Sequence, residues 1–269
     1  MRPLALLLLL CAACDDAEPT ETADAAPDAG PDAALVDAAP TTVTLSGQAF
    51  SFGPGGQVAG ATVSVLEHPE ITTQTADDGT FSLAGVPAEA EATLVLDDPN
   101  RPPIQTGTQH LAGVDLERLT FQAPNHDLYR ALAAVVQVTP DPERCQIATT
   151  VTRRGNSLFD EIPGTHGEPE ATVTIEPEPE GVDGPVYFDL VRYDTIFPSR
   201  PLTQTTADGG VLFLNVPPGE YTLKAHKPDT VFADVHIKCR AGFLVNASPP
   251  YGLQALEGGV GPRTEPDWQ

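Results

Sequence analysis

Basic residues are scarce in this sequence. Its 269 residues include 14 Lys and Arg against 38 Asp and Glu, which gives a formal net charge of −24. The three lysines, Lys224, Lys227 and Lys238, all follow residue 220. A chain this acidic repels phosphate backbones and anionic lipid surfaces. We therefore expect no nucleic-acid partner.

Large flexible and aromatic side chains are also rare. A single Met and a single Trp stand against 28 Pro and 23 Gly. This composition excludes an ordinary helical enzyme and predicts short segments separated by turns. The apolar run Leu4–Leu10 is far too short to cross a bilayer as a helix.

The sequence lacks the common catalytic and metal-binding motifs. None of its six histidines is followed three residues later by Glu, as a zinc carboxypeptidase would require. It contains no Gly-x-Ser-x-Gly elbow, no phosphate-binding Gly-rich loop and no Asp-x-Asp-x-Asp-Gly calcium loop. We expect no enzyme, no cofactor and no metal site.

The N-terminus has the layout of a secretory signal. Arg2 precedes the apolar run Leu4–Leu10, and two small residues, Ala12 and Ala13, precede Cys14. This layout resembles a bacterial lipoprotein signal, in which cleavage precedes a cysteine that then carries lipid. The resemblance implies that Cys14 is lipidated and that the protein is exported and anchored to a membrane of the cell envelope. The alternative is an ordinary signal cut near Ala13.

Two cysteines remain beyond the signal, Cys145 and Cys239. Both lie in alternating segments typical of half-buried strands, 145–152 and 231–239, on the faces expected to be buried. A single pair in an oxidising compartment is most simply a disulfide. We predict a Cys145–Cys239 bond; the alternative is two free buried thiols.

The remaining chain reads as an all-β protein with tandem domains. Residues 15–41 hold eight acids and no base among Ala, Pro and Thr, which predicts an extended, disordered segment. From Thr42, Thr- and Val-rich alternation between Gly, Pro and Asp turns is typical of strands. The expected segments are a signal peptide (1–14), a disordered acidic linker (15–41), a first β-sandwich domain (42–124), a connecting helix (125–142), a second β-sandwich domain (143–257) and a flexible tail (258–269).

The connecting helix has clear end signals. Asn125 can cap it, Asp127 suits its positive end, and Pro140 stops it. Its expected apolar face consists of Leu128, Leu132, Val135 and Val136.

An internal repeat supports two related domains. At an offset of 130 residues, short matching segments recur in the same order. They are Thr42–Leu45 with Thr172–Ile175, Gln74-Thr75 with Gln204-Thr205, Asp78-Gly79 with Asp208-Gly209, and Val86-Pro87 with Val216-Pro217.

Each copy contains an Asp-Gly turn followed by a strand. Asp78-Gly79 precedes residues 80–87, and Asp208-Gly209 precedes 210–217 with a Pro-Gly turn after it. We expect positive φ at both glycines. This pattern resembles the carboxypeptidase regulatory-like domain, a small transthyretin-like β-sandwich grouped with carbohydrate-binding-like folds. Every position in the pattern serves a turn or a core, so it indicates fold rather than function.

These features together favour a non-catalytic, lipid-anchored envelope protein that acts as a structural or protein-interaction module. Its partners would be the membrane, through the lipid, and an envelope protein or a glycan. The alternative is a carbohydrate-binding module of the cell envelope. A glycan platform needs exposed coplanar aromatics, whereas the tyrosines read as core and rim residues and Trp268 lies in the tail.

Overall fold

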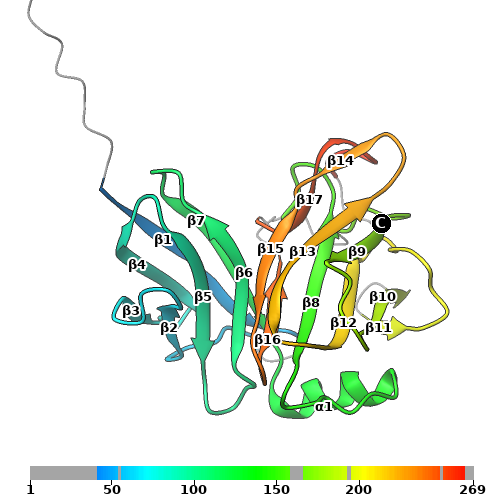
Figure 1. Cartoon of the computed structure of the whole chain (residues 1–269), viewed down its shortest axis with the longest axis horizontal. Helices are drawn as coiled ribbons and strands as arrows, with labels where there is room; N and C mark the ends of the chain where they lie inside the picture. The colour runs from blue at the N-terminus through cyan, green and yellow to red at the C-terminus, as the bar shows by residue number, and fades with distance from the viewer. Residues whose placement is uncertain (1–40, 54–55, 158–165, 193–194, 249–250, 264–269) are drawn as a thin grey trace, which may run out of the picture. The chain divides into compact units, whose positions relative to one another are not determined.

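The computed structural model describes residues 41–53, 56–157, 166–192, 195–248 and 251–263 (Figure 1). These residues form an all-β fold with a single α-helix, α1 (His126–Val135). The first lobe contains β1 (Thr42–Ser51), β2 (Thr62–Val65), β3 (Thr72–Gln74), β4 (Thr80–Pro87), β5 (Glu91–Asp97), β6 (Ile104–His110) and β7 (Leu116–Ala123). The second lobe contains β8 (Cys145–Thr152), β9 (Thr172–Glu176), β10 (Asp183–Arg192), β11 (Thr195–Ser199), β12 (Gly210–Val216), β13 (Gly219–His226), β14 (Thr230–Phe232), β15 (Val235–Cys239), β16 (Leu244–Ala247) and β17 (Leu253–Gly258).

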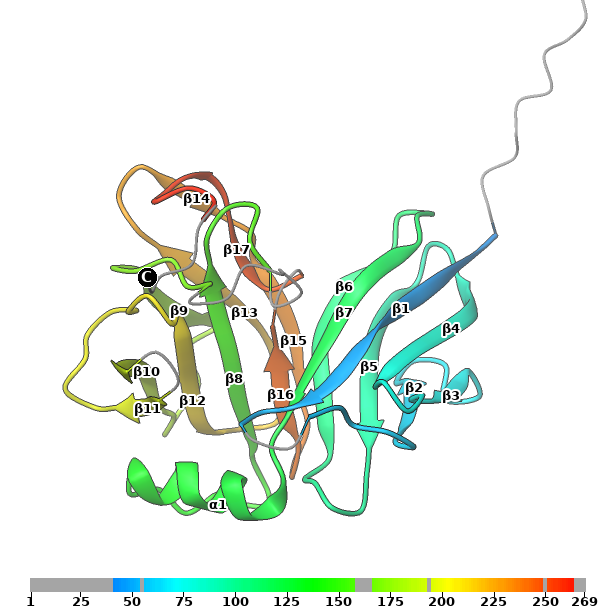
Figure 2. The same ribbon diagram turned by 180° about the vertical axis from the view of Figure 1, so that it is seen from behind.

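Each lobe packs two layers of strands around a hydrophobic core. In the first lobe the sheet β4–β1–β7 packs against β3, β2, β5 and β6, and Figure 2 shows β1 between its two neighbours. Leu45 and Phe121 meet Leu94 and Ile104 in this core. In the second lobe β10, β12, β8 and β16 form one layer, and β15, β13 and β9 form the other.

The lobes share one continuous sheet. Strand β16 of the second lobe pairs in parallel with β6 of the first, and β15 forms an antiparallel bridge to β6 at His236 and Thr108. Gly107 makes this close approach possible, because a Cβ there would lie 2.9 Å from Cγ1 of Val235. The contacts of residues 39–269 form one compact unit.

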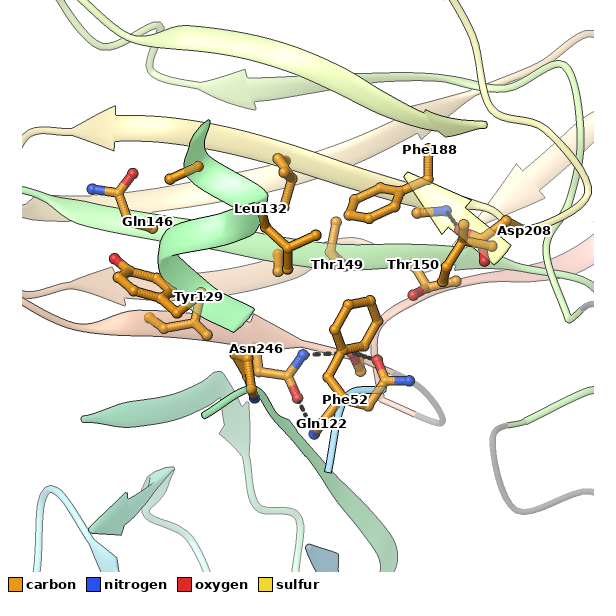
Figure 3. Close-up of a pocket in the computed structure, with 18 of the residues that line it drawn as sticks. Phe52, Gln122, Tyr129, Leu132, Gln146, Thr149, Thr150, Phe188, Asp208 and Asn246 are labelled. Atoms are coloured by element: carbon orange, nitrogen blue, oxygen red, sulfur yellow. Dashed lines mark hydrogen bonds between the residues drawn. The ribbon is translucent and has the colours of Figure 1, made fainter. Parts of the chain in front are cut away.

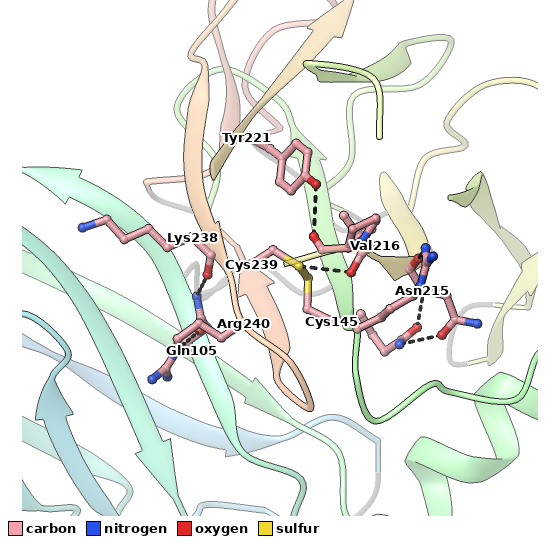
Figure 4. Close-up of a disulfide and its surroundings, with 11 residues drawn as sticks. Gln105, Cys145, Asn215, Val216, Tyr221, Lys238, Cys239 and Arg240 are labelled. Carbon is pink, nitrogen blue, oxygen red and sulfur yellow. Dashed lines mark hydrogen bonds between the residues drawn. A yellow bond between two sulfur atoms is a disulfide. The ribbon is translucent and has the colours of Figure 1, made fainter. Parts of the chain in front are cut away.

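The disulfide links the two layers of the second lobe (Figure 4). Cys145 in β8 and Cys239 in β15 are bonded, with a Cα–Cα distance of 5.7 Å, and both are buried. The segment of Cys239 is not one alternating strand as expected. It divides at Ala233, whose N–H donates to Gln254 O, so β14 pairs with β17 while β15 pairs with β13. Val231, expected to point inward, is consequently 52% exposed.

Helix α1 begins where the sequence predicts and ends earlier. The Oδ1 atom of Asn125 accepts from Leu128 N at 2.8 Å. The helix ends at Val135, well before Pro140, in a Schellman motif in which Gln137 has a φ of +60° and Val138 N donates to Ala133 O. Its buried face is rotated toward Ala133 and Val136, which leaves Val135 49% exposed and corrects the expected apolar face.

The Asp-Gly turns of the two lobes have the same geometry. Gly79 has a φ of +77° and Gly209 one of +79°. Their carbonyls accept from Ala49 N and Val151 N, both at 2.9 Å. These bonds make β1 the counterpart of β8 and β4 the counterpart of β12.

The first expected repeat match is therefore wrong. Thr42–Leu45 lies in β1, whereas Thr172–Ile175 lies in β9, whose true counterpart is β2. The hydroxyls of Thr75 and Thr205 identify this pairing, because they accept from Ala61 N and Ala171 N, immediately before β2 and β9. Thr and Val are common in β-strands in general, so two strands that are not equivalent can have similar sequences. The match between these two segments is of this kind.

The expected flexible tail does not begin at residue 258. Val260 N donates to Oε1 of the buried Glu168 at 3.0 Å, and Arg263 N donates to Asn156 Oδ1 at 2.7 Å. Lys227 forms an ion pair with the same Glu168. These contacts hold residues 259–263 against the second lobe.

Candidate functional site

A cavity of about 400 Å³ lies under α1, between the helix, the outer face of the second lobe and the end of β1 (Figure 3). Most of its lining side chains are apolar. The apolar lining residues are Phe50, Phe52, Pro124, Leu132, Ala133, Pro140, Ala148, Phe188, Leu190, Ile196, Leu212, Leu214 and Leu244.

The outer face of the sheet β10–β12–β8 forms the floor of the cavity. Phe188, Leu212 and Leu214 lie on this face and pack with Val136 from the end of α1. Phe52, just after β1, meets Phe188 edge to face, with ring centroids 6.4 Å apart and an interplanar angle of 80°. The first lobe therefore closes one side of a pocket that the second lobe builds.

Two hydrogen-bonded amides, Asn246 and Gln146, form polar parts of the wall, and Asn246 is bonded to the first lobe. Asn246 in β16 accepts from Gln122 N at 2.7 Å and donates to Ser248 Oγ at 2.8 Å. Gln146 in β8 pairs through its side chain with Asn215, at 2.9 Å in both directions. Because these groups satisfy one another, this wall is fixed rather than adaptable.

Asp208 and Tyr129 lie at opposite ends of the lining (Figure 3). Burial raises the pKa of the Asp208 carboxyl from 3.8 to about 6, against the opposing effect of a hydrogen bond from Gly210 N at 3.0 Å. Burial also raises the pKa of Tyr129 to about 12, so its hydroxyl stays protonated well above neutral pH. His166 is the other titratable residue in the lining, which contains no Lys or Arg among the described residues.

Of the predicted site residues within the described ranges, Asp208 alone lines this cavity. Gly209 follows it in the turn, while Asp78 and Gly79 occupy the equivalent turn of the first lobe. The disulfide lies in the core of the second lobe, on the opposite face of β8. Cys14 lies outside the described residues, as does nearly all of the acidic linker.

The cavity was not predicted from the sequence, because the alternation in β8 indicates one buried face and one face exposed to solvent. That side carries Gln146 and Ala148, which line the cavity instead. The available signal was β12, where Val211–Leu214 is a continuous apolar run buried on both faces. Such a run predicts a strand covered on both sides.

Several polar side chains that could have served chemistry have structural partners. His226 Nε2 bonds Thr174 Oγ1 at 3.0 Å, and His236 Nδ1 bonds Thr222 Oγ1 at 3.1 Å, each across a pair of adjacent strands. Tyr187 is buried, so its ring cannot form part of an exposed aromatic platform, and its hydroxyl accepts from Val173 N. The Tyr221 hydroxyl donates to Pro217 O.

Within the part of the chain that the structure describes, no three His, Cys, Asp or Glu side chains gather closely enough to hold a metal ion. Among the same residues, no helix combines the length and apolarity needed to cross a membrane.

Comparison with known proteins assigns no family to this chain. No family model matches it, and no curated protein is significantly similar. The similar solved structures include the Bacillus anthracis TIE protein (13% identity, TM-score 0.26), the minor pilin GBS52 of Streptococcus agalactiae (8%, 0.24) and the shaft pilin SpaA of Lactobacillus rhamnosus GG (10%, 0.23). The aligned regions cover 80%, 82% and 82% of this chain, and 34%, 100% and 100% of those chains. The chain thus spans about a third of the first protein, and similarity at this level assigns no function.

Proposed function

We propose that this protein is an exported, lipid-anchored envelope protein whose two β-lobes serve together as a non-catalytic structural or protein-interaction module. The observation that carries the proposal is the junction between the lobes. Strand β6 continues into the second lobe through β16 and β15, which favours a unit that can transmit force or hold a fixed geometry.

Charged and amide side chains reinforce this junction. Lys238 donates to Glu67 at 2.7 Å and to Glu91 at 2.8 Å, both in the first lobe. The buried Gln105 in β6 donates to Lys238 O at 2.6 Å and accepts from Arg240 Nε at 2.8 Å (Figure 4). These paired polar groups favour one fixed arrangement of the two lobes. Moving the lobes apart would leave the groups without partners, which would cost stability.

Export and anchoring rest on two supports. The Cys145–Cys239 disulfide suits an oxidising compartment. The residues from Arg2 to Cys14 resemble a lipoprotein signal, and the acidic segment after them suits a spacer. The Asp-Gly turns and the strands after them support the resemblance to carboxypeptidase regulatory-like domains.

Membrane fractionation tests the anchor. Cys14→Ser should move the protein from the membrane fraction to the aqueous phase, because the thiol that carries the lipid is removed. Cys11→Ser is the matched control and should leave the protein in the membrane, because Cys11 follows the bulky Leu10 and is not the expected lipidation site. Retention of Cys14→Ser in the membrane would overturn the anchor.

Carbohydrate binding by the described lobes stays a prediction. Binding to a glycan array, abolished by substitution of an exposed aromatic residue, would replace the structural proposal with this alternative.

A further inference from the structure

The cavity under α1 goes beyond what a structural module needs. Filling it with larger side chains would stabilise the fold, since an unfilled apolar volume forfeits packing energy. Its volume of about 400 Å³ lies within the range of small-molecule sites, and its lining combines apolar walls with a few fixed polar groups. This combination is typical of a binding site.

The two Asp-Gly turns differ in the hydrogen bonds that their aspartate side chains accept. In the first lobe, Asp78 Oδ1 accepts from Thr80 N at 3.0 Å and from Thr80 Oγ1 at 2.6 Å, on the exposed surface. These bonds lower the pKa of Asp78. In the second lobe the residue equivalent to Thr80 is Gly210, so this position offers the Asp208 carboxylate a backbone N–H and no hydroxyl.

Gly210 also makes space for the aromatic wall. A Cβ at this position would lie 2.7 Å from Cδ2 of Phe188. The same glycine therefore allows Phe188 to line the cavity and leaves the Asp208 carboxylate with a single hydrogen bond, from Gly210 N, among the described residues. The second oxygen, Oδ1, has no hydrogen-bond partner within the described part of the chain and can accept from a molecule in the cavity.

We propose that this cavity binds one small, apolar molecule that carries a protonated amine, with the ammonium group at the Asp208 carboxylate. The apolar walls would bury the carbon skeleton. An ammonium would pair with a carboxylate that is otherwise poorly compensated in its partly buried position. A ligand carboxylate is disfavoured, because the described lining offers Asp208 and no Lys or Arg.

Isothermal titration calorimetry on the full chain at neutral pH tests the proposal with a matched pair of probes, 1-naphthylmethylamine and 1-naphthoic acid. The amine should bind at least about tenfold more tightly than the acid. Asp208→Asn keeps an oxygen for the Gly210 hydrogen bond and should weaken amine binding about tenfold. Asp78→Asn, in the equivalent turn, should leave it unchanged.

Two variants that fill the cavity from opposite walls complete the test. Ala148→Phe from β8 and Leu132→Trp from α1 should each abolish amine binding while the circular dichroism spectrum and the disulfide are retained. If Ala148→Phe fails to fold, Leu132→Trp decides. Equal affinity for the acid, binding retained in a folded filled variant, or no amine binding to the folded wild type at millimolar concentration would each overturn the proposal. None of these outcomes bears on the membrane anchor.

Discussion

Asp208 shows how one small neighbouring residue changes the chemistry of a repeated turn. Its counterpart Asp78 lies on the surface with two hydrogen bonds from Thr80, and its pKa is lowered. Asp208 beside Gly210 is partly buried, and its pKa is raised to about 6. The folded state therefore disfavours the charged form of Asp208, and the destabilisation grows as the pH rises from about 4 to about 6.

Asp208→Asn should consequently stabilise the protein at pH 8, by up to about 3 kcal/mol. Below pH 4 it should have little effect, because the protonated Asp208 side chain is then neutral, as the Asn side chain is. Chemical denaturation at several pH values measures this difference. Asp78→Asn should act in the opposite direction at pH 8, because the lowered pKa means that the Asp78 charge stabilises the fold. A gain from Asp208→Asn that does not change with pH would contradict the assigned cause.

At the scale of the element, the turns before β4 and β12 fix how each strand joins its sheet. A Cβ on Gly209 would lie 2.3 Å from Val151 O and 2.7 Å from Gly167 Cα. Gly85, in β4, also has a positive φ, of +82°, but a Cβ there would meet nothing within 4 Å. Comparing the two glycines therefore separates the cost of the positive φ, which both share, from the cost of the close contacts, which Gly209 alone of the two has.

Gly209→Ala should destabilise the protein by about 3 kcal/mol or more, because the backbone strain and the clash add. Gly85→Ala should cost about 1–2 kcal/mol, from the left-handed backbone alone. Urea denaturation of both variants measures the difference. An equal loss of unfolding free energy in the two variants would contradict the close contact of Gly209 with Val151 and Gly167.

The strands show which features alternation can predict. It identified the buried faces of Cys145 and Cys239, because period-2 burial depends only on the local sequence and on one covered side. It did not predict the break at Ala233 or the cover over Ala148, because both depend on segments distant in the chain, β17 and α1. The pairing of β16 with β6 had no local signal, since it joins residues about 140 positions apart.

The two ends of helix α1 differ in how well the sequence predicts them. Asn125 was predictable as the cap because capping needs one side chain and the next three residues. The end of the helix was not, because Gln137 occupies a left-handed position for which Gly or Asn is the usual residue.

At the scale of the whole molecule, the disulfide closes a loop whose ends are 94 residues apart. Chain entropy gives such a bond about 4–5 kcal/mol of stabilisation. Cys145→Ala with Cys239→Ala should therefore lower the melting temperature by about 10 °C or more. Mass spectrometry of the non-reduced wild type should show the two cysteine peptides linked, and free thiols in protein taken from the envelope would contradict the assignment.

The central claim is that the two lobes form one structural unit through β6, β15 and β16. Differential scanning calorimetry of the oxidised full chain tests it most directly, because independent domains unfold in separate transitions. We predict a single transition whose calorimetric and van't Hoff enthalpies agree. Two resolved transitions, one of which shifts on reduction of the disulfide while the other does not, would contradict the claim.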